Sequence, residues 1–459
     1  MPKHAVYDYD LLVIGSGSGG NVAANIAAKD GKKVAIVDEA PKLGGECPNW
    51  ACVPTKALLR AAEHYRMAKN AGDYGISTGK LKVDYKQVKA YKDLVVSRTG
   101  TDKAEQFFNK QGIDVIHGHG HFIDTHTLSV AGKRYKAHKF LIASGTASFI
   151  PPIEGIEDVD YLTYEQAIDL NKPPKSMAII GGGAIGCEFA TIFNTFDVKV
   201  ALFEAAPRLL AREEPETAEL SKAIMDKQGI RIETDTIVEK VESHGKQIVL
   251  HYLSGDRRGK LTVDSILIAA GKKPNTQIGL ENAGVEYDNH GIKTNEFMQT
   301  SAKHIFAAGD VVGPYQFTHT ASYQSRIAGN NMITRKDNWQ VTDYHSIPRC
   351  VFIEPEIASV GLTEQQIRDQ GIVPRIGTAP ISQIGRSNTE NMRDGMVKVV
   401  TNQKGNILGA SIVAPHAGEM IHELAVAIKF DIHAHEISNM VHAFPTWSEA
   451  IKVACGNIE

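Results

Sequence analysis

The chain carries the same glycine-rich fingerprint twice, and this duplication constrains its fold more than any other feature of the sequence. In the first copy, an apolar run over residues 11–14 leads into Gly15-Ser-Gly17-Ser-Gly-Gly20, then an alanine-rich helical stretch and a second apolar run that ends at Asp38. This order of strand, glycine turn, helix, strand and acid is the dinucleotide-binding βαβ unit. The glycines let a pyrophosphate approach the helix N-terminus, and Asp38 can bind a ribose hydroxyl. We therefore expect a dinucleotide here.

The second copy predicts a second dinucleotide. An apolar run over residues 176–180 leads into Gly181-Gly-Gly183-Ala-Ile-Gly186, and the next strand ends at Glu204. An acid at this position accepts the 2′-hydroxyl of NAD and repels the 2′-phosphate of NADP. Two alanines follow Glu204, and Arg208 and Arg212 lie only slightly further along the chain. The sequence therefore favours NAD(H), with NADP(H) as the alternative if one of these arginines reaches the phosphate.

Composition excludes several other classes of protein. Of the 459 residues, 42% are hydrophobic and 22% are charged, as in an ordinary globular enzyme. The formal charge of −3 gives no electrostatic footprint for nucleic acid or for an anionic membrane. No apolar run approaches the ~18–20 residues of a membrane span, and the first ten residues have no signal-peptide core. We expect a cytoplasmic protein.

Two of the five cysteines, Cys47 and Cys52, stand four residues apart in the string GGECPNWACVPTK, directly after the first nucleotide unit. A helix is expected over residues 57–67, and Pro54 suits its first turn. A cysteine at a helix N-terminus has its thiolate favoured by unpaired N–H groups and by the helix dipole. Such a pair can form a disulfide, accept two electrons and exchange with an external disulfide.

Other interpretations of the cysteines are less favoured by their surroundings. Cys47 and Cys52 could be buried inert thiols or zinc ligands, but no further Cys or His cluster lies nearby to complete a zinc shell. We expect no resident metal ion. Cys187 and Cys350 lie in apolar stretches and are expected in the core, and Cys455 is expected to be incidental.

These segments resemble the class I pyridine nucleotide-disulfide oxidoreductases, the family of dihydrolipoamide dehydrogenase, glutathione reductase and mercuric reductase. The likeness covers essentially the whole chain and includes both fingerprints, GGECPNWACVPTKALL, GKKPN at 271–275, AGD at 308–310, PEIASVGL at 355–362 and FPTWSE at 444–449. The overall pattern resembles dihydrolipoamide dehydrogenase most, with Glu204 matching its NAD-selecting acid. The resemblance implies a homodimeric FAD enzyme that passes electrons from NAD(P)H through flavin to a Cys47–Cys52 disulfide and on to a disulfide such as that of lipoamide.

The resemblance also implies roles for single residues. Cys47 would be the interchange thiol that meets the substrate, and Cys52 the charge-transfer thiol against the flavin. Lys56 would lie near flavin N5 and pair with Glu188. The expected cofactor-binding residues are Gly15, Gly17, Gly20, Asp38, Glu39, Gly44, Gly45, Lys56, Gly181, Gly183, Gly186, Glu204, Gly271, Asp310 on the ribityl chain and the Thr318 backbone on the pyrimidine edge.

The expected fold is α/β, with two Rossmann-like dinucleotide-binding domains and a C-terminal α+β dimerisation domain. The glycine fingerprints stop near residue 342, and strands such as 396–400 alternate with helices such as 419–429 beyond it. The expected boundaries are 1–147 and 272–341 for the FAD-binding domain, 148–271 for the NAD(H)-binding domain and 342–459 for the dimer-interface domain. Each active site would take its C-terminal residues from the partner subunit.

One position departs from the family pattern. The disulfide reductases carry a His-Pro-Thr-x-x-Glu string, in which the histidine is the general base for the thiols and the glutamate orients it. This chain has Phe444 at the histidine position, although Glu449 is present. General-base help is worth about 10²–10⁴-fold in rate, so dithiol–disulfide exchange is expected to be weak. His442 would point the same way in an extended segment and could substitute, or it could be a surface or interface histidine.

Three functions are therefore open. The first is a dihydrolipoamide-dehydrogenase-like enzyme that uses His442 or water as the base. The second is a mercuric-reductase-like enzyme for metal ions, quinones or other acceptors that need no base, although the vicinal C-terminal cysteines of mercuric reductase are absent from this sequence. The third is an FAD-holding redox sensor or interaction protein without turnover.

Overall fold

The computed structural model describes residues 7–459, and the contacts within the chain group it into two compact units. Unit 1 consists of the residues up to Ala57, Ala90–Phe149 and Gly271–Thr342. Unit 2 consists of Leu58–Lys89, Ile150–Ala270 and Asp343–Glu459. The helices α3 (Cys52–Lys69) and α4 (Tyr85–Arg98) each contribute residues to both units. The division into four domain segments stays a prediction.

Unit 1 is built on a sheet in the order β3-β2-β1-β6-β5-β4, with β19 paired to β6. Strands β1, β2, β3, β6 and β19 run parallel, and β4 and β5 add antiparallel pairs at one side. Residues 11–14 of β1 and 34–37 of β2 are continuous apolar runs because this part of the sheet is buried on both faces. The strands are β1 (Tyr9–Ile14), β2 (Val34–Asp38), β3 (Ile113–His117), β4 (Gly120–Asp124), β5 (Thr127–Val130), β6 (Lys133–Ile142) and β19 (Ile305–Ala307).

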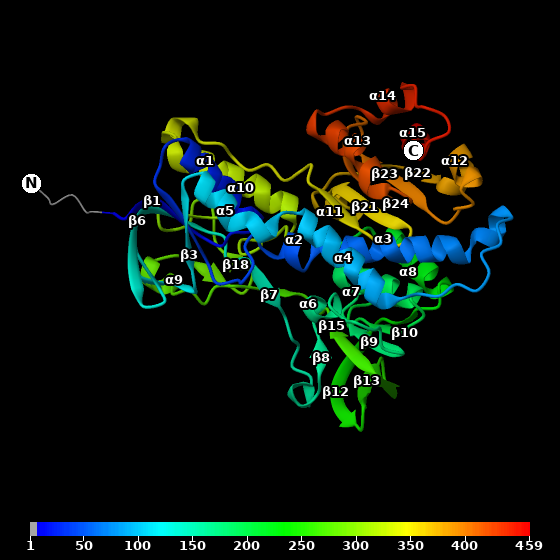
Figure 1. Ribbon diagram of the computed structural model, residues 1–459. Coiled ribbons are helices and arrows are strands. Elements are labelled where there is room, and N and C mark those ends of the chain that lie inside the picture. The colour runs from blue at the N-terminus through cyan, green and yellow to red at the C-terminus, as the bar shows by residue number, and fades with distance from the viewer. Residues whose placement is uncertain (1–6) are drawn as a thin grey trace, which may run out of the picture. The chain divides into compact units, whose positions relative to one another are not determined.

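Two helices of unit 1, α1 (Ser18–Lys29) and α10 (Thr318–Ile333), pack closely along each other (Figure 1). The Ala23 N–H donates to Oγ of Ser325 at 3.0 Å, and a Cβ on Gly329 would come within 2.9 Å of the Ala23 Cα. The small residues Ala23 and Gly329 therefore permit close packing of the fingerprint helix against a helix that comes much later in the chain. The remaining elements of unit 1 are α2 (Glu46–Asn49), α5 (Ala104–Lys110), α9 (Leu280–Ala283), the pair β7 (Thr146–Ser148) with β16 (Lys272–Pro274), and the pair β17 (Tyr287–Asp288) with β18 (Gly291–Ile292).

Unit 2 contains a second parallel sheet in the order β11-β10-β9-β15-β8, whose strands carry the second fingerprint. An antiparallel sheet, β12-β13-β14, packs against it in one apolar core. The elements are β8 (Tyr161–Leu162), α6 (Tyr164–Ala167), β9 (Ser176–Ile180), α7 (Ala184–Thr195), β10 (Lys199–Phe203), α8 (Pro215–Lys227), β11 (Arg231–Glu233), β12 (Thr236–His244), β13 (Gln247–Ser254), β14 (Arg257–Val263) and β15 (Ser265–Ile268).

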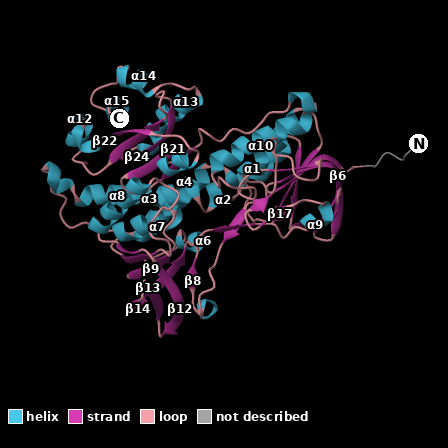
Figure 2. Cartoon of the chain, turned by 180° about the vertical axis from the view of Figure 1, so that it is seen from behind, coloured by secondary structure: helices cyan, strands magenta, loops and turns pink. Residues whose placement is uncertain are grey.

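The C-terminal part of unit 2 is an antiparallel sheet in the order β20-β21-β24-β23-β22. Helices α13 and α15 lie over this sheet, and apolar residues of both form one core with it (Figure 2). The elements are β20 (Pro348–Val351), β21 (Glu356–Gly361), α11 (Glu364–Asp369), β22 (Arg375–Pro380), α12 (Gly385–Thr389), β23 (Met396–Thr401), β24 (Ile407–Ala414), α13 (Ala417–Lys429), α14 (Ala434–Asn439) and α15 (Glu449–Gly456).

The expected fold class is confirmed: two Rossmann-like sheets are followed by an antiparallel α+β part. One element begins earlier than expected, because α3 starts at Cys52 and not at residue 57. Pro54 lies within its first turn, where a backbone N–H is not needed for the helix. Within residues 7–459, no helix combines the length and the apolar character that crossing a bilayer would require.

Candidate redox and nucleotide sites

The first fingerprint holds its acid against its own glycine loop. Oδ2 of Asp38, at the end of β2, accepts hydrogen bonds from the Ser16 N–H at 2.7 Å and from the Ser16 hydroxyl at 2.5 Å, and Oδ1 accepts from the Ala40 N–H at 2.9 Å. Gly17 is the N-cap of α1, and no side chain caps this helix. An adenine dinucleotide fits here, because a pyrophosphate can take the uncapped N–H groups and carboxylate lone pairs remain for a ribose.

The loop before the cysteines lies directly on this fingerprint. The Gly44 N–H donates to Oγ of Ser16 at 2.8 Å. Gly45 has φ +77°, and a Cβ there would be 2.7 Å from the Cα of Gly17. Only glycine permits both this backbone conformation and this approach. The contact fixes Cys47, two residues later, beside the expected nucleotide.

The second fingerprint repeats the arrangement. Oε2 of Glu204 accepts from the Gly182 N–H at 2.6 Å, and Oε1 accepts from the Ala206 N–H at 2.7 Å. Gly183 is the uncapped N-cap of α7, and a Cβ there would meet no atom within 4 Å. Arg208 donates from Nη2 to the Ala211 carbonyl at 3.2 Å. The loop therefore offers a carboxylate and open space for a second nucleotide. The Arg208 guanidinium instead contacts the backbone three residues later, at Ala211.

The two cysteines lie close together as half-buried thiols in unit 1. Cys47 belongs to the single-turn helix α2, and Cys52 is the first residue of α3. Sγ of Cys52 is 3.3 Å from Oγ1 of Thr318, the first residue of α10. The hydrogen bond with Cys52 and burial raise the pKa of Cys47, whereas Thr318 and the Lys56 ammonium act in the opposite direction. The thiol pair therefore meets the N-terminal ends of two long helices.

Charged and unsatisfied polar groups surround this pair. Glu46, the residue before Cys47, forms an ion pair with Lys272. Burial raises the pKa of the Asp310 carboxyl, and the Lys272 ammonium partly opposes this. Between the cysteines, Oδ1 of Asn49 and Nε1 of Trp50 are buried and have no hydrogen-bond partner among the described residues. Buried polar atoms normally have partners, so these atoms fit a site that a bound group completes.

Two expected neighbours of the redox pair fall in different units. Lys56 belongs to unit 1 and Glu188 to unit 2, so their pairing stays a prediction. Glu188 is buried on α7, and its Oε1 accepts a hydrogen bond from the Phe352 N–H at 3.1 Å. Of the other expected cofactor residues, Glu39 is exposed and lies 3.0 Å from Nδ1 of His119.

In the C-terminal segment, Phe444 and His442 have different surroundings: the first side chain is exposed and the second is buried. The ring of Phe444 is on the surface, with 78% of the residue exposed. The side chain of His442 is only 5% exposed, and its Nε2 donates to Oε1 of Glu423 on α13 at 2.9 Å. Residues 440–448 form no strand, so the alternation that would place both rings on one side does not apply. Oε2 of Glu449 accepts from the Thr446 N–H at 3.2 Å.

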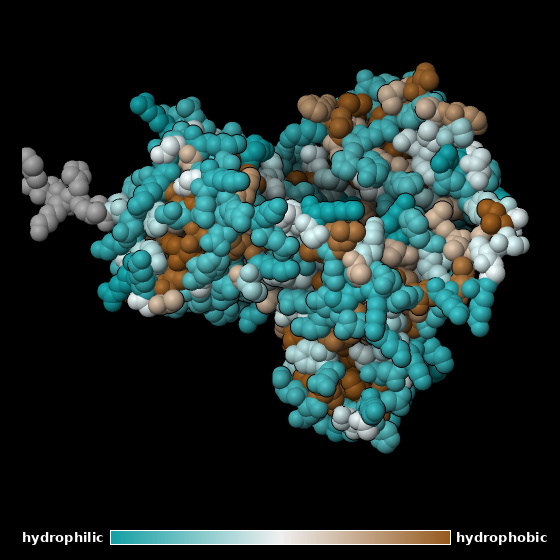
Figure 3. All heavy atoms as spheres, in the orientation of Figure 1, coloured by the Kyte–Doolittle hydropathy of each residue, from teal (hydrophilic) through white to brown (hydrophobic). Residues whose placement is uncertain are grey.

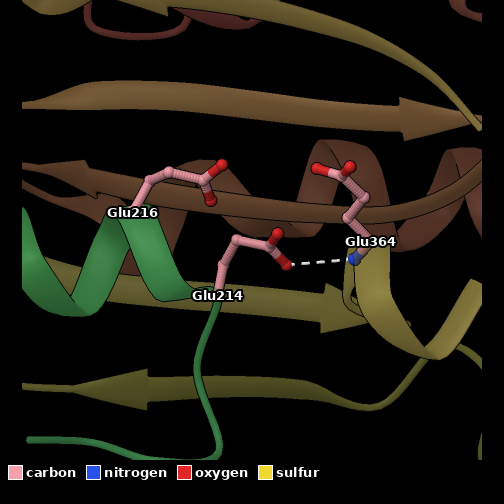
Figure 4. Close-up of side chains that lie close together, drawn as sticks. All are labelled: Glu214, Glu216 and Glu364. Atoms are coloured by element: carbon pink, nitrogen blue, oxygen red, sulfur yellow. Dashed lines mark hydrogen bonds between the residues drawn. The ribbon is translucent and has the colours of Figure 1, made fainter. Parts of the chain in front are cut away.

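Unit 2 also contains an acidic cluster. The carboxylates of Glu214, Glu216 and Glu364 gather at the N-terminal ends of α8 and α11, where helix dipoles favour negative charge (Figure 4). The buried ammonium of Lys398 lies among them, with Nζ–O distances of 2.7, 2.9 and 2.8 Å, respectively. Burial alone would lower the pKa of Lys398, but hydrogen bonds to the three carboxylates raise it. The cluster is therefore an internal ion-pair network in which Lys398 supplies the cation.

Sequence reasoning missed the Thr318 hydroxyl, the Glu46–Lys272 pair and Lys398. Their partners are remote in sequence, and no local pattern reports contacts of that kind. The one available signal for Thr318 was its position at the start of a helical stretch close to the expected flavin.

Two family models together match most of the chain. Residues 9–325 match the family described as pyridine nucleotide-disulphide oxidoreductase, and residues 347–455 match the dimerisation domain of the same family. The chain belongs to this family. It is an oxidoreductase of the flavoprotein class with a redox-active disulfide, from a family that binds FAD and NAD(P)H, and it carries a dimerisation domain.

Similar proteins span several activities. The chain is 34% identical to a mercuric reductase of Staphylococcus aureus, over 97% of this chain and 82% of that protein. It is also 34% identical to a dihydrolipoyl dehydrogenase of Geobacillus stearothermophilus, over 97% and 96%. The HOCl-induced flavoprotein disulfide reductase RclA from Escherichia coli superposes with a TM-score of 0.87 at 29% identity, over 98% and 99% of the two chains. A Cu(II) complex of RclA superposes equally well, with a TM-score of 0.87 at 28% identity.

Proposed function

We propose that this enzyme takes electrons from NADH and delivers them, through the Cys47–Cys52 pair, to an acceptor that needs no histidine base. The acceptor class we propose is a thiophilic, reducible metal ion such as Cu(II). One observation carries the proposal: Phe444 is exposed at the position of the base, and the ring of His442 is directed into α13. Phenylalanine has no group that accepts a proton, and both ring nitrogens of His442 lie within hydrogen-bond distance of other groups, the Met440 carbonyl and the Glu423 carboxylate.

The chemistry of the two acceptor classes explains this preference. Reduction of a disulfide breaks its S–S bond, and the released sulfur must be protonated while the interchange thiol loses its proton. A metal ion binds thiolate sulfur directly, and its reduction releases no sulfur that must be protonated, so the one proton of Cys47 can pass to solvent. The missing base, worth about 10²–10⁴-fold, therefore slows the first reaction more than the second.

The electrons and protons balance in the proposed reaction. NADH gives two electrons and one proton to the Cys47–Cys52 disulfide and leaves as NAD⁺, so that Cys52 is a thiolate and Cys47 a thiol. Two Cu(II) ions then take one electron each, the S–S bond forms again, and the Cys47 proton is released to solvent. Bound FAD supplies the two-electron transfer between nicotinamide and disulfide.

The cofactors would be held by residues of the two fingerprints. Gly15, Gly17, Gly20 and Asp38 would hold the adenosine and pyrophosphate of FAD, with Asp310 on the ribityl chain. For NADH, the corresponding residues are Gly181, Gly183, Gly186 and Glu204. The fit rests on the uncapped helix N-termini and on the carboxylates at the ends of β2 and β10.

The names of two relatives support a metal-ion acceptor. Mercuric reductases are among the similar proteins, and RclA has been obtained as a Cu(II) complex. We favour Cu(II) as the test substrate because Cys455, the one cysteine near the C-terminus, is 3% exposed and cannot pass Hg(II) to Cys47. A dihydrolipoyl dehydrogenase matches as fully in sequence, so lipoamide is the comparison substrate.

Steady-state kinetics with the FAD-loaded protein test the proposal. We expect the kcat/KM of NADH oxidation to be higher with chelated Cu(II) than with lipoamide, and Cys47→Ser to abolish the Cu(II) activity. The variant Cys455→Ser serves as the matched control and should retain it. A native enzyme that reduces lipoamide faster than Cu(II) would refute the proposed acceptor, and an enzyme without any turnover would favour the sensor interpretation.

A further inference from the structure

We propose that Thr318 is a positioning residue whose hydroxyl donates a hydrogen bond to the Cys52 sulfur, so that Cys52 and not Cys47 holds the negative charge after reduction. The inference rests on the roles proposed above for the two cysteines. It concerns the side chain of Thr318, whereas the expected flavin contact of this residue involves only its backbone.

The geometry around Cys52 favours a thiolate at this sulfur. Oγ1 of Thr318 is 3.3 Å from Sγ of Cys52, within hydrogen-bond range for sulfur. Cys52 opens the 18-residue helix α3, and Thr318 opens the 16-residue helix α10. Helix N-termini stabilise a thiolate through their free N–H groups and their dipole. The hydroxyl adds a directed donor, and hydrogen bonds to charged groups are stronger than those to neutral groups.

The surroundings of Cys47 are less favourable to negative charge. Its helix, α2, has only four residues, and the first of them is Glu46, which directly precedes Cys47. The hydrogen bond with Cys52 and burial both raise the pKa of Cys47. The Thr318 hydroxyl is near enough to act on Cys47 as well, but it has one proton and can donate to only one sulfur at a time.

The charged groups of unit 1 near the pair do not by themselves select one sulfur. Lys56 lies on α3, the helix that begins at Cys52, and its ammonium lowers the pKa of Cys47. Glu46 and Lys272 form an ion pair with each other, and the buried Asp310 carboxyl interacts with both. The hydroxyl of Thr318 is a neutral group within hydrogen-bond distance of the Cys52 sulfur, so its removal should change the charge distribution within the dithiol.

Breaking the Cys47–Cys52 bond takes up two electrons and one proton, which gives one thiolate and one thiol. A thiolate at Cys52 should give long-wavelength absorption by charge transfer to the flavin, and Cys52→Ser should abolish this band while Cys47→Ser keeps it. The pH at which the band disappears then reports the pKa of Cys52. This measurement responds to the hydrogen bond and not to overall folding.

The decisive experiment titrates this band with pH in the FAD-loaded Cys47→Ser protein, in which Cys52 is the remaining thiol of the pair. Thr318→Val keeps the shape and removes the donor, and Thr318→Ser keeps the donor. We expect Thr318→Val to raise the pKa of Cys52 by about one unit or more, as loss of a hydrogen bond to a charged group should. Thr318→Ser should stay near the native value.

If Thr318→Val leaves the pKa of Cys52 unchanged in the Cys47→Ser protein, the inference is overturned. An equal shift of this pKa in Thr318→Ser would also overturn it. If Thr318→Val loses its flavin, Thr318→Ala in the same background provides the titration and is judged by the same criteria. A second overturning result is a shift confined to Cys47, measured as the pH profile of alkylation in Cys52→Ser. Absence of the band in the native protein would instead refute the proposed role of Cys52.

Discussion

Glu204 is the residue that we propose selects NADH, and its carboxylate is already held by two backbone N–H groups. Its two oxygens accept from the N–H groups of Gly182 and Ala206, which leaves further lone pairs for the 2′-hydroxyl of NADH. A 2′-phosphate would meet a fixed negative charge, and Arg208 is bound to the Ala211 carbonyl. The sequence predicted this acid from its place at a strand end, but not its two backbone partners.

We expect kcat/KM to be higher for NADH than for NADPH. Glu204→Gln keeps an acceptor for the Gly182 N–H and removes the charge, so it should lower the NADH/NADPH ratio by about tenfold or more, equivalent to roughly 1.4 kcal/mol. Arg208→Ala is the control and should leave the ratio unchanged. A native preference for NADPH would contradict this account of the site.

At the scale of elements, the fingerprint strands and helices were predictable because their apolar runs and glycine turns are local. The strand expected at 176–180 is β9, and the helix expected at 419–429 is α13, which begins at Ala417. The segment that carries His442 and Phe444 was not predictable in the same way. It was treated as extended, but the contact between His442 and Glu423 on α13 turns the ring inward, and such a contact between segments leaves no periodic pattern.

The Lys398 network joins elements in the same nonlocal way and should contribute to stability. Lys398→Met would leave the carboxylate of Glu214, which is 5% exposed, without its cation. Removing one partner of a buried ion pair costs about 3–5 kcal/mol, so we expect the free energy of unfolding to fall by about 3 kcal/mol or more in urea denaturation at pH 7. Lys404→Met, at an exposed turn, is the control and should change it by less than about 0.5 kcal/mol.

The cost of Lys398→Met should depend on pH in a defined direction. The hydrogen bond from Lys398 lowers the pKa of Glu364 below its usual 4.5, with burial acting against it. A carboxyl with a lowered pKa contributes stability above its unfolded pKa and loses it as the pH falls through the folded pKa. The difference between native and Lys398→Met proteins should therefore shrink below about pH 4.5. A difference that grows on acidification would contradict the network as described.

At the scale of the whole molecule, the dimerisation domain implies a homodimer, and its surface carries a candidate interface. Apolar side chains lie on the surface over α13 and α14 (Figure 3), and the exposed ones in this region are Val426, Phe430, Met440, Val441 and Phe444. Contiguous exposed apolar patches mark protein–protein contacts. The sequence suggested the dimer through family resemblance, whereas surface exposure is a property of the folded chain.

Val441→Glu should weaken the dimer, because Val441 is 91% exposed in the single chain and a charge there would be buried at the interface. We expect light scattering after size-exclusion chromatography to give a dimer for the native protein and a larger monomer fraction for Val441→Glu. Val373→Glu, at another exposed apolar residue, is the matched control and should stay dimeric. A native monomer would contradict the assembly.

The position of the missing base gives the most direct test of the account. Phe444→His restores the imidazole of the family pattern five residues before Glu449, whose carboxylate would orient it. We expect lipoamide turnover to rise by up to about 10²-fold, with Cu(II) turnover little changed. His442→Ala should leave the native lipoamide rate low and unaltered. Fast native lipoamide turnover that Phe444→His does not increase would contradict the claim that this chain serves an acceptor without a proton relay.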